Sequence, residues 1–276
     1  MSVPQKCLRA LAIVLTGVVW NGIALAQSGE DRFVVGAMGD SITRAFDTGR
    51  PLDNPALSWA TGDDVFGRVE SHLVRLKQMH GKKTAGYNVA RSGGKAIEIP
   101  GQAAKLAPHK PDYVTILIGA NDLCDWPDDA QRELEDLQQN VRSGIERLIA
   151  ANPNVLIALS PVPDMYNLWE IGHGNSCQAK WNLLNFCSRL LSPSATAVGR
   201  EALVEQWYEV NAAYAGIAEE FPLNVRFAAA GADVKFEKEH ISAIDCFHPS
   251  IEGQNLLSEI VWEAVAPDLE SLVRSP

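Results

Sequence analysis

Two short motifs contain residue types that together could transfer an acyl group. Ser41, in Gly39-Asp40-Ser41, follows an apolar run and offers its hydroxyl as a nucleophile. A serine hydroxyl reacts poorly unless a base takes its proton, and His248 in the segment DCFHPS could be that base. Asp245, three residues before His248, could hold the imidazole in the tautomer that accepts the proton. These side chains predict a Ser-His-Asp catalytic triad.

The same chemistry requires donors for the negative oxygen of the tetrahedral intermediate. The backbone N–H groups of Ser41 and Gly93 and the side-chain amide of Asn121 are the predicted donors of this oxyanion hole. Gly93 lies in the segment RSGG and Asn121 in the segment GAND. An asparagine suits this role because its amide donates hydrogen bonds without carrying a charge.

Each motif alone has an ordinary structural interpretation. Ser41 can cap a helix, and Asn121 can lie in a polar strand-to-helix turn. Asp245 and His248 can form the turn before a helix that Ser250 caps. At average residue frequencies, each of Gly-Asp-Ser, Gly-x-Asn-Asp and Asp-x-x-His-Pro arises by chance in roughly one to several chains in a hundred. All three occur here, which favours a single site.

The elements that must bring these motifs together are visible as apolar patterns. Four apolar runs predict strands, at residues 33–38, 86–90, 113–119 and 155–160. Apolar residues recur at helical spacing in three segments, at residues 65–76, 134–149 and 256–264. Strands alternating with helices predict an α/β fold with a parallel sheet covered on both faces. The carboxyl ends of parallel strands share one edge, so Ser41, RSGG and GAND should lie close together.

The sequence also suggests roles for residues between and around these elements. Asp63 and Asp64 are predicted to cap the helix that begins near Val65, and His72 within it is predicted to be structural or solvated. Residues 42–62 and 161–199 are predicted to be long connections. Five large side chains either line an acyl-binding groove or fill the small core of a loop: Trp126, Tyr166, Leu168, Trp169 and Trp181.

Composition and charge restrict the class of protein. The 276 residues are 46% hydrophobic and 21% charged, which is enough for one sizeable core. The net charge is −10, and Lys and Arg are not clustered, which argues against a nucleic-acid partner. No Cys-His cluster has the spacing of a zinc site, so no metal is predicted.

The N-terminal residues have the layout of a secretory signal peptide. Lys6 and Arg9 precede an apolar run, and the small residues Ala24 and Ala26 suit cleavage after Ala26. The run is shorter than the ~20 residues that span a bilayer, which disfavours the alternative of an uncleaved membrane anchor. The prediction is a signal peptide over residues 1–26 and one secreted or periplasmic domain over residues 27–276, without a stable membrane span.

The cysteine content agrees with export. Cys7 lies in the predicted signal peptide, and four cysteines remain: Cys124, Cys177, Cys187 and Cys246. An even number in an oxidising compartment predicts two disulfides. Four cysteines allow three pairings, and the sequence does not choose among them.

The motifs resemble those of the SGNH, or GDSL-type, hydrolases. The similarity rests on Gly39-Asp40-Ser41, on Gly93 in NVARSGG, on Asn121 in GAND, and on Asp245 with His248 in DCFHP. These are the four motif blocks of that family, in order. The first block reads GDSIT where the family has GDSL, and in the second block Gly94 is the alternative to Gly93. The segments LSWATGDD, GANDLCDW and DCFHPS are similar to the phospholipase B branch.

The resemblance implies a flavodoxin-like three-layer α/β/α sandwich with a mainly parallel sheet. It also implies no cofactor, no metal and a small-molecule or lipid ester as substrate, with (lyso)phospholipids among the candidates. Two other functions fit the same residues. One is a carbohydrate acetylesterase with the same catalytic groups, and the other is a non-catalytic binding module that keeps the fold. The oligomeric state does not follow from the sequence.

Overall fold

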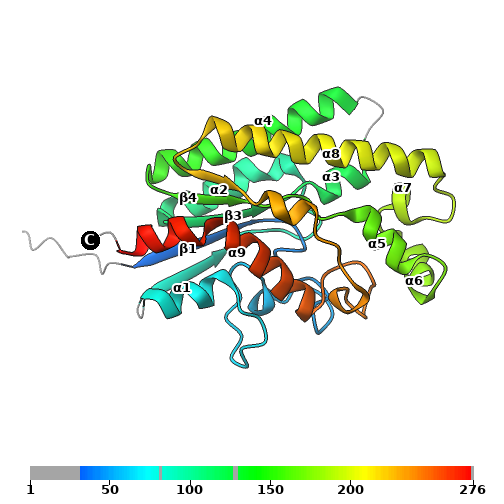
Figure 1. The fold of residues 1–276 in the computed structure, drawn as a ribbon, viewed down its shortest axis with the longest axis horizontal. Helices are drawn as coiled ribbons and strands as arrows, with labels where there is room; N and C mark the ends of the chain where they lie inside the picture. Colours follow the sequence, from blue (N-terminus) through cyan, green and yellow to red (C-terminus); the bar gives the residue numbers. More distant parts are fainter. Residues whose placement is uncertain (1–31, 81–82, 127–129, 275–276) are drawn as a thin grey trace, which may run out of the picture. The chain divides into compact units, whose positions relative to one another are not determined.

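The centre of the molecule is a parallel sheet (Figure 1). The computed structural model describes residues 32–80, 83–126 and 130–274. Within these residues the sheet has five strands in the order β2-β1-β3-β4-β5. The strands are β1 (Phe33–Gly39), β2 (Thr84–Asn88), β3 (Tyr113–Leu117), β4 (Leu156–Leu159) and β5 (Val225–Phe227). Four of them were predicted, whereas β5 has three residues and no clear apolar pattern.

Helices cover both faces of the sheet, which confirms the three-layer α/β/α fold. One face packs against α2 (Ile99–Leu106), α4 (Ala130–Ala151) and α8 (Ala197–Glu220). The other face packs against α1 (His72–His80) and α9 (Ile251–Arg274). Short 3-10 helices lie at Pro55–Leu57, Ala96–Glu98, Ala107–His109, Ala229–Ala232 and Lys238–His240.

The continuous apolar strands follow from this double covering. In β3, Val114 and Ile116 face the layer of α2, α4 and α8, whereas Tyr113 and Leu117 face the layer of α1 and α9. All five residues of β3 are buried. Because alternate side chains point to opposite faces, a strand buried on both faces has to be apolar throughout.

The helix predicted from Val65 begins only at His72, so that prediction was wrong in its first turns. Val65 and Phe66 are 91% and 79% exposed, and Gly67 adopts a positive φ of 63° that interrupts a helix. The carboxylate of Asp64 binds Arg68 within this turn. Ser71 instead caps α1, since its Oγ accepts a hydrogen bond from the N–H of Val74.

His72 is a structural residue, as predicted. Its Nδ1 lies 2.7 Å from the hydroxyl of Tyr113 in β3, and its Nε2 lies 2.9 Å from the carbonyl of Ser258 in α9. Burial lowers the pKa of His72 to about 3, so the imidazole is neutral in the folded protein. His72 therefore joins three elements without a charge.

The segment predicted as a long connection after residue 161 contains three short helices. They are α5 (Met165–Gly172), α6 (Ser176–Leu184) and α7 (Ser188–Leu191), and Figure 1 shows them at one end of the sheet, next to the short helix α3 (Ala120–Cys124). Disulfides join Cys124 to Cys187 and Cys177 to Cys246. Both bridges predicted from the cysteine count are present, and their pairing is now defined.

The predicted signal peptide over residues 1–26 lies outside the described residues. Among the helices of the described ranges, none combines the length and hydropathy that crossing a bilayer requires.

Candidate active site

Ser41 lies in a tight turn at the carboxyl end of β1. Gly39 has a φ of +145°, and a Cβ there would lie 2.2 Å from the carbonyl oxygen of Leu117, so only glycine fits. Asp40 Oδ1 accepts a hydrogen bond of 2.9 Å from the N–H of Ile42. The chain thus leaves the sheet sharply and presents the Ser41 hydroxyl above its edge.

The three predicted triad residues lie within hydrogen-bond distance of one another. His248 Nε2 is 2.8 Å from Ser41 Oγ, and His248 Nδ1 is 2.5 Å from Asp245 Oδ2. The other carboxylate oxygen, Asp245 Oδ1, accepts the backbone N–H groups of Phe247 and His248. Burial alone would raise the pKa of Asp245, but the hydrogen bond and charge of His248 outweigh it and hold that pKa below its usual value.

The predicted oxyanion donors line one cavity together with Ser41 and His248. The Asn121 side-chain amide donates to the carbonyl of Gly94 at 2.9 Å, which leaves its second N–H available. The N–H of Gly94 donates to the carbonyl of Arg91, whereas the N–H groups of Ser41 and Gly93 have no acceptor among residues 32–80, 83–126 and 130–274. Gly93 has a φ of +75°. The geometry therefore favours Gly93 over Gly94 as the donor.

Two buried glutamines hold the turn that carries Ser41. Gln102 in α2 accepts the N–H of Gly39 at 2.8 Å and donates to the carbonyl of the same residue at 2.9 Å. Gln254 in α9 accepts the N–H of Trp59 at 2.8 Å and donates to the carbonyl of Ile42 at 3.0 Å. One glutamine therefore fixes the residue two positions before Ser41, and the other fixes the residue directly after it.

Side-chain bridges also connect the predicted oxyanion loops. Both carboxylate oxygens of Asp122 accept the N–H of Ala96, which joins the GAND segment to the loop after Gly93. Burial raises the pKa of Asp122 to about 6. The loop that carries Gly93 is also tied to the segment after Ser41: the hydroxyl of Ser92 donates to Asp53, and the carboxylate of Asp53 pairs with Arg44.

Two further carboxyl groups adjoin the triad. Asp47 lies within hydrogen-bond reach of Asp245. Burial and the nearby carboxylate of Asp245 raise the pKa of Asp47. The N–H of Leu52, which donates to Asp47, acts in the other direction and lowers it. Burial also raises the pKa of Asp40 to about 7. Asp40 Oδ2 has no hydrogen-bond partner in the described part of the chain. Both groups therefore favour the protonated form more than a solvated aspartate does.

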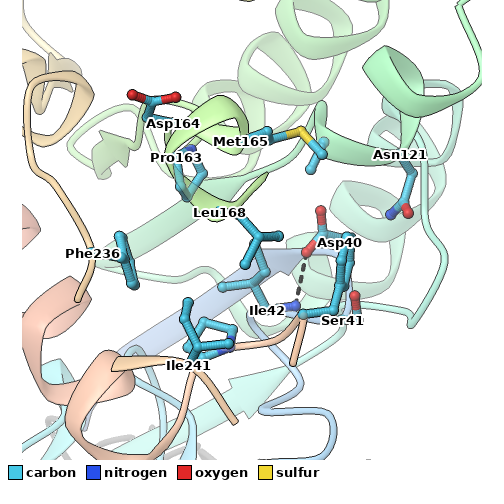
Figure 2. A pocket seen from close by; sticks show the side chains of 13 residues that line it. Asp40, Ser41, Ile42, Asn121, Pro163, Asp164, Met165, Leu168, Phe236 and Ile241 are labelled. Carbon is cyan, nitrogen blue, oxygen red and sulfur yellow. Dashed lines mark hydrogen bonds between the residues drawn. The ribbon is translucent and has the colours of Figure 1, made fainter. Parts of the chain in front are cut away.

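Two cavities of the described structure reach Ser41. The first has a volume of about 60 Å³ and apolar walls; Figure 2 shows Leu168, Ile42 and Ile241 between Ser41 and Phe236. The second has a volume of about 270 Å³ and is lined by His248, Gly93 and polar side chains such as Ser92 and Asn185. Asn121 borders both.

The five large side chains singled out in the sequence have different roles. Leu168 lines the apolar cavity beside Ser41. Tyr166 and Trp169 line a separate cavity with Arg200, whose guanidinium lies 4.6 Å from the Trp169 ring centroid. Trp181 is buried and donates from Nε1 to the carbonyl of Cys246, and Trp126 is buried in the core. Of these five side chains, only Leu168 therefore lines the cavity next to Ser41.

Sequence reasoning missed Gln102, Gln254 and Asp47. Both glutamines bind backbone atoms, which carry no signal in the sequence, and Gln102 lies in a helix that was not predicted. Asp47 follows Ser41 by six residues in the segment treated as a long connection. No group of three or more His, Cys, Asp or Glu side chains in the described ranges is arranged to hold a metal ion.

Comparison with known sequences identifies relatives. The model of the GDSL-like Lipase/Acylhydrolase family matches residues 37–256. The sequence is 26% identical over 280 residues to "Phospholipase B1, membrane-associated" of Homo sapiens. That match includes 83% of this chain and 18% of the human protein, so the chain spans about a fifth of the length of this relative.

Comparison with solved structures shows the same fold. A Clostridium thermocellum family 3 carbohydrate esterase is similar with a TM-score of 0.52 and 16% identity, over 88% of this chain and 99% of that one. The structure of TesA is similar with a TM-score of 0.51 and 18% identity, over 85% of this chain and 98% of that one. At these identities the likeness concerns the arrangement of strands and helices.

Proposed function

The chain belongs to the GDSL-like lipase/acylhydrolase family, and we propose that it hydrolyses carboxylic esters with Ser41, His248 and Asp245 as its catalytic residues. The observation that most supports the proposal is the continuous hydrogen-bonded row from Ser41 Oγ through His248 to Asp245, at 2.8 Å and 2.5 Å. Ser41 is 7% exposed, His248 5% and Asp245 0%, so little water competes for these contacts.

In the proposed mechanism, Ser41 Oγ forms a bond to the acyl carbon while its proton passes to His248 Nε2. Collapse of the tetrahedral adduct breaks the bond to the alcohol oxygen, which takes that proton from His248. A water molecule then attacks the acyl-enzyme, gives a proton to His248 and releases the acid, and Ser41 recovers the proton. Asp245 keeps the imidazole oriented and balances its positive charge.

The negative oxygen of each tetrahedral adduct would lie against the N–H groups of Ser41 and Gly93 and the amide of Asn121. Donors that are already fixed stabilise this charge without reorganising during the reaction. The hydrogen bond from Asn121 to Gly94 and the bridge from Asp122 to Ala96 keep the donors in place. Removing Asn121 as a donor should therefore lower kcat by about 10²–10³.

We also propose which esters the protein hydrolyses and where it acts. The human relative is named a phospholipase B, which makes phospholipids and lysophospholipids candidate substrates at 26% identity. We propose export with cleavage after Ala26, since the two disulfides are compatible with an oxidising compartment.

Replacement of the nucleophile tests the assignment. Ser41→Ala should lower kcat on p-nitrophenyl butyrate by on the order of 10⁴ or more and abolish labelling by a fluorophosphonate probe. Ser194→Ala, which removes an exposed serine, is the matched control and should behave as the wild type. Full activity of a folded Ser41→Ala protein would contradict the role of Ser41.

A further inference from the structure

The two cavities that meet at Ser41 differ in size, polarity and access to His248. We propose that the narrow apolar cavity takes the acyl group and that the wider polar cavity takes the alcohol, so the substrates are short-chain acyl esters of bulky alcohols and not the long-chain phospholipids among the candidates. This inference rests on the proposed function, because it assigns sides to the bond that Ser41 cleaves.

The position of His248 decides which side is which. The imidazole must give its proton to the oxygen of the departing alcohol, so the alcohol has to lie on the side of His248. His248 lines the wider cavity and does not line the narrow one. The carbonyl oxygen of the ester is directed at Gly93 and Asn121. The third substituent of the reacting carbon is the acyl chain, and the narrow cavity is the space left for it.

The size of the narrow cavity limits that chain. A volume of about 60 Å³ is small beside the roughly 300–1,000 Å³ of pockets that bury a drug-sized ligand. Its walls include the apolar side chains of Ile42, Met165, Leu168, Phe236, Ile241 and Phe247. Phe236 lies across the cavity from Ser41 in Figure 2 and is 8% exposed. An acyl chain of two to about four carbons fits this space.

Two carboxyl side chains, Asp40 and Asp164, also line the narrow cavity. Figure 2 shows the carboxylate of Asp164 turned away from the apolar side chains. This carboxylate caps α5 through the N–H of Asn167 and pairs with Lys235. An uncharged acyl group is therefore the best complement to the walls.

The wider cavity suits a larger and more polar group. Its volume of about 270 Å³ is more than four times that of the acyl cavity. Ser92, Asn185 and Asp125 offer hydrogen-bonding groups, while Phe46 and Phe186 provide aromatic surface. This combination fits an alcohol with a ring and hydroxyl groups, such as a sugar or an aryl alcohol.

A pair of isomeric esters tests the side assignment directly. Benzyl acetate carries its ring on the alcohol side, and methyl phenylacetate carries the same ring on the acyl side, with equal numbers of every atom. We expect kcat/KM for benzyl acetate to exceed that for methyl phenylacetate by about tenfold or more, since the ring does not fit the narrow cavity. A preference for methyl phenylacetate would overturn the proposal.

A series of p-nitrophenyl esters below their micelle concentrations tests the length limit. The acetate and butyrate should be the best substrates of the wild type, and the octanoate should be poorer by about tenfold or more. Phe236→Ala should shift the optimum toward the octanoate, and Leu168→Ala provides a second variant if the first does not fold. Phe66→Ala, which removes a phenylalanine 79% exposed in the turn before α1, should keep the wild-type profile.

The outcomes separate this inference from the proposed function. A wild-type optimum at the octanoate or beyond, with Ser41→Ala inactive, contradicts the short acyl cavity and leaves the serine mechanism intact. Unchanged profiles for folded Phe236→Ala and Leu168→Ala proteins also contradict it. A protein that hydrolyses none of these esters contradicts the proposed function, and the inference with it.

Discussion

The hydroxyl of Ser41 depends on residues that do not touch it. Gln102 binds both backbone polar groups of Gly39, and Gln254 binds the carbonyl of Ile42.

The residue types and spacing of Ser41, Asn121, Asp245 and His248 were enough to predict a site. In the structure, Ser41, His248 and Asp245 lie within hydrogen-bond distance of one another. The glutamines could not be predicted, because a side chain that binds backbone atoms leaves no paired motif in the sequence.

Gln102→Leu should disturb the nucleophile turn. The change leaves the buried N–H of Gly39 unpaired and removes one of the donors to its carbonyl, which should lower the free energy of unfolding by about 2 kcal/mol. Displacement of Ser41 should lower kcat about tenfold or more while KM changes little. Urea unfolding and kinetics on p-nitrophenyl butyrate measure both effects. Gln139→Leu on the exposed face of α4 is the control, and equal kcat values for both variants would contradict a positioning role.

Asp40 should make stability depend on pH. Its pKa is about 7 in the folded protein and near 3.8 when solvated, so between these values the folded state holds a proton that the unfolded state has released. This contribution to stability decreases as pH rises from about 4 to 7. Asp40→Asn does not titrate, so it should gain at least about 1 kcal/mol relative to the wild type between pH 5 and pH 8. Urea unfolding at both pH values measures the free energy of unfolding of the two proteins. The same difference between Asp40→Asn and the wild type at pH 5 and pH 8 would contradict the raised pKa of Asp40.

At the level of elements, four of the five strands could be predicted because strands buried on both faces are apolar throughout. The helices α4 and α9 could be predicted from their apolar spacing, whereas α2 and α8 were not predicted. The start of α1 could not be predicted, since Val65 and Phe66 continue the helical spacing while Gly67 turns the chain away. The short helices α5, α6 and α7 were also missed. Disulfides tether α6 and α7, and a short helix held in this way needs no long amphipathic pattern.

His72 should couple the packing of α1, β3 and α9 to pH. Its pKa is about 3 in the folded protein and 6.5 when solvated, so only the unfolded state gains a proton between these values. Stability is therefore lost as pH falls from 6.5 toward 3. His72→Gln should be less stable at pH 7 because it loses ring contacts with Trp59 and Trp262. Its deficit should shrink by about 2 kcal/mol or more at pH 4.

Guanidinium unfolding at pH 7 and pH 4 compares His72→Gln with the wild type. His109→Gln, which makes the same replacement at an exposed position, is the matched control. A deficit of His72→Gln that stays constant or grows in acid would show that His72 is not held neutral.

At the scale of the whole molecule, two disulfides connect the helices α6 and α7 to the segments that carry Asn121 and Asp245. Cys124 ends α3, three residues after Asn121, and Cys246 directly follows Asp245. The sequence predicted two bridges but allowed three pairings, and only the three-dimensional arrangement selects one. The bridges thereby support the predicted oxyanion donor and the triad acid from outside the sheet.

Removal of the Cys177–Cys246 bridge should affect both stability and catalysis. The bridge closes a loop of 69 residues, and losing it should lower the free energy of unfolding by about 4 kcal/mol. Cys177→Ser with Cys246→Ser should also lower kcat on p-nitrophenyl butyrate, because Asp245 loses the support of its neighbour. Thermal unfolding and kinetics measure the two losses. A double variant with wild-type kcat would show that the loop needs no bridge.

The amide of Gln254 comes from α9, yet it supports the turn directly after β1 by accepting from Trp59 and donating to Ile42. Ribosomal synthesis therefore makes this turn long before its partners, because His248 follows Ser41 by 207 residues and Gln254 follows Ile42 by 212. A nascent polypeptide that already contains Ser41 but not yet Gln254 lacks the contact that braces this turn.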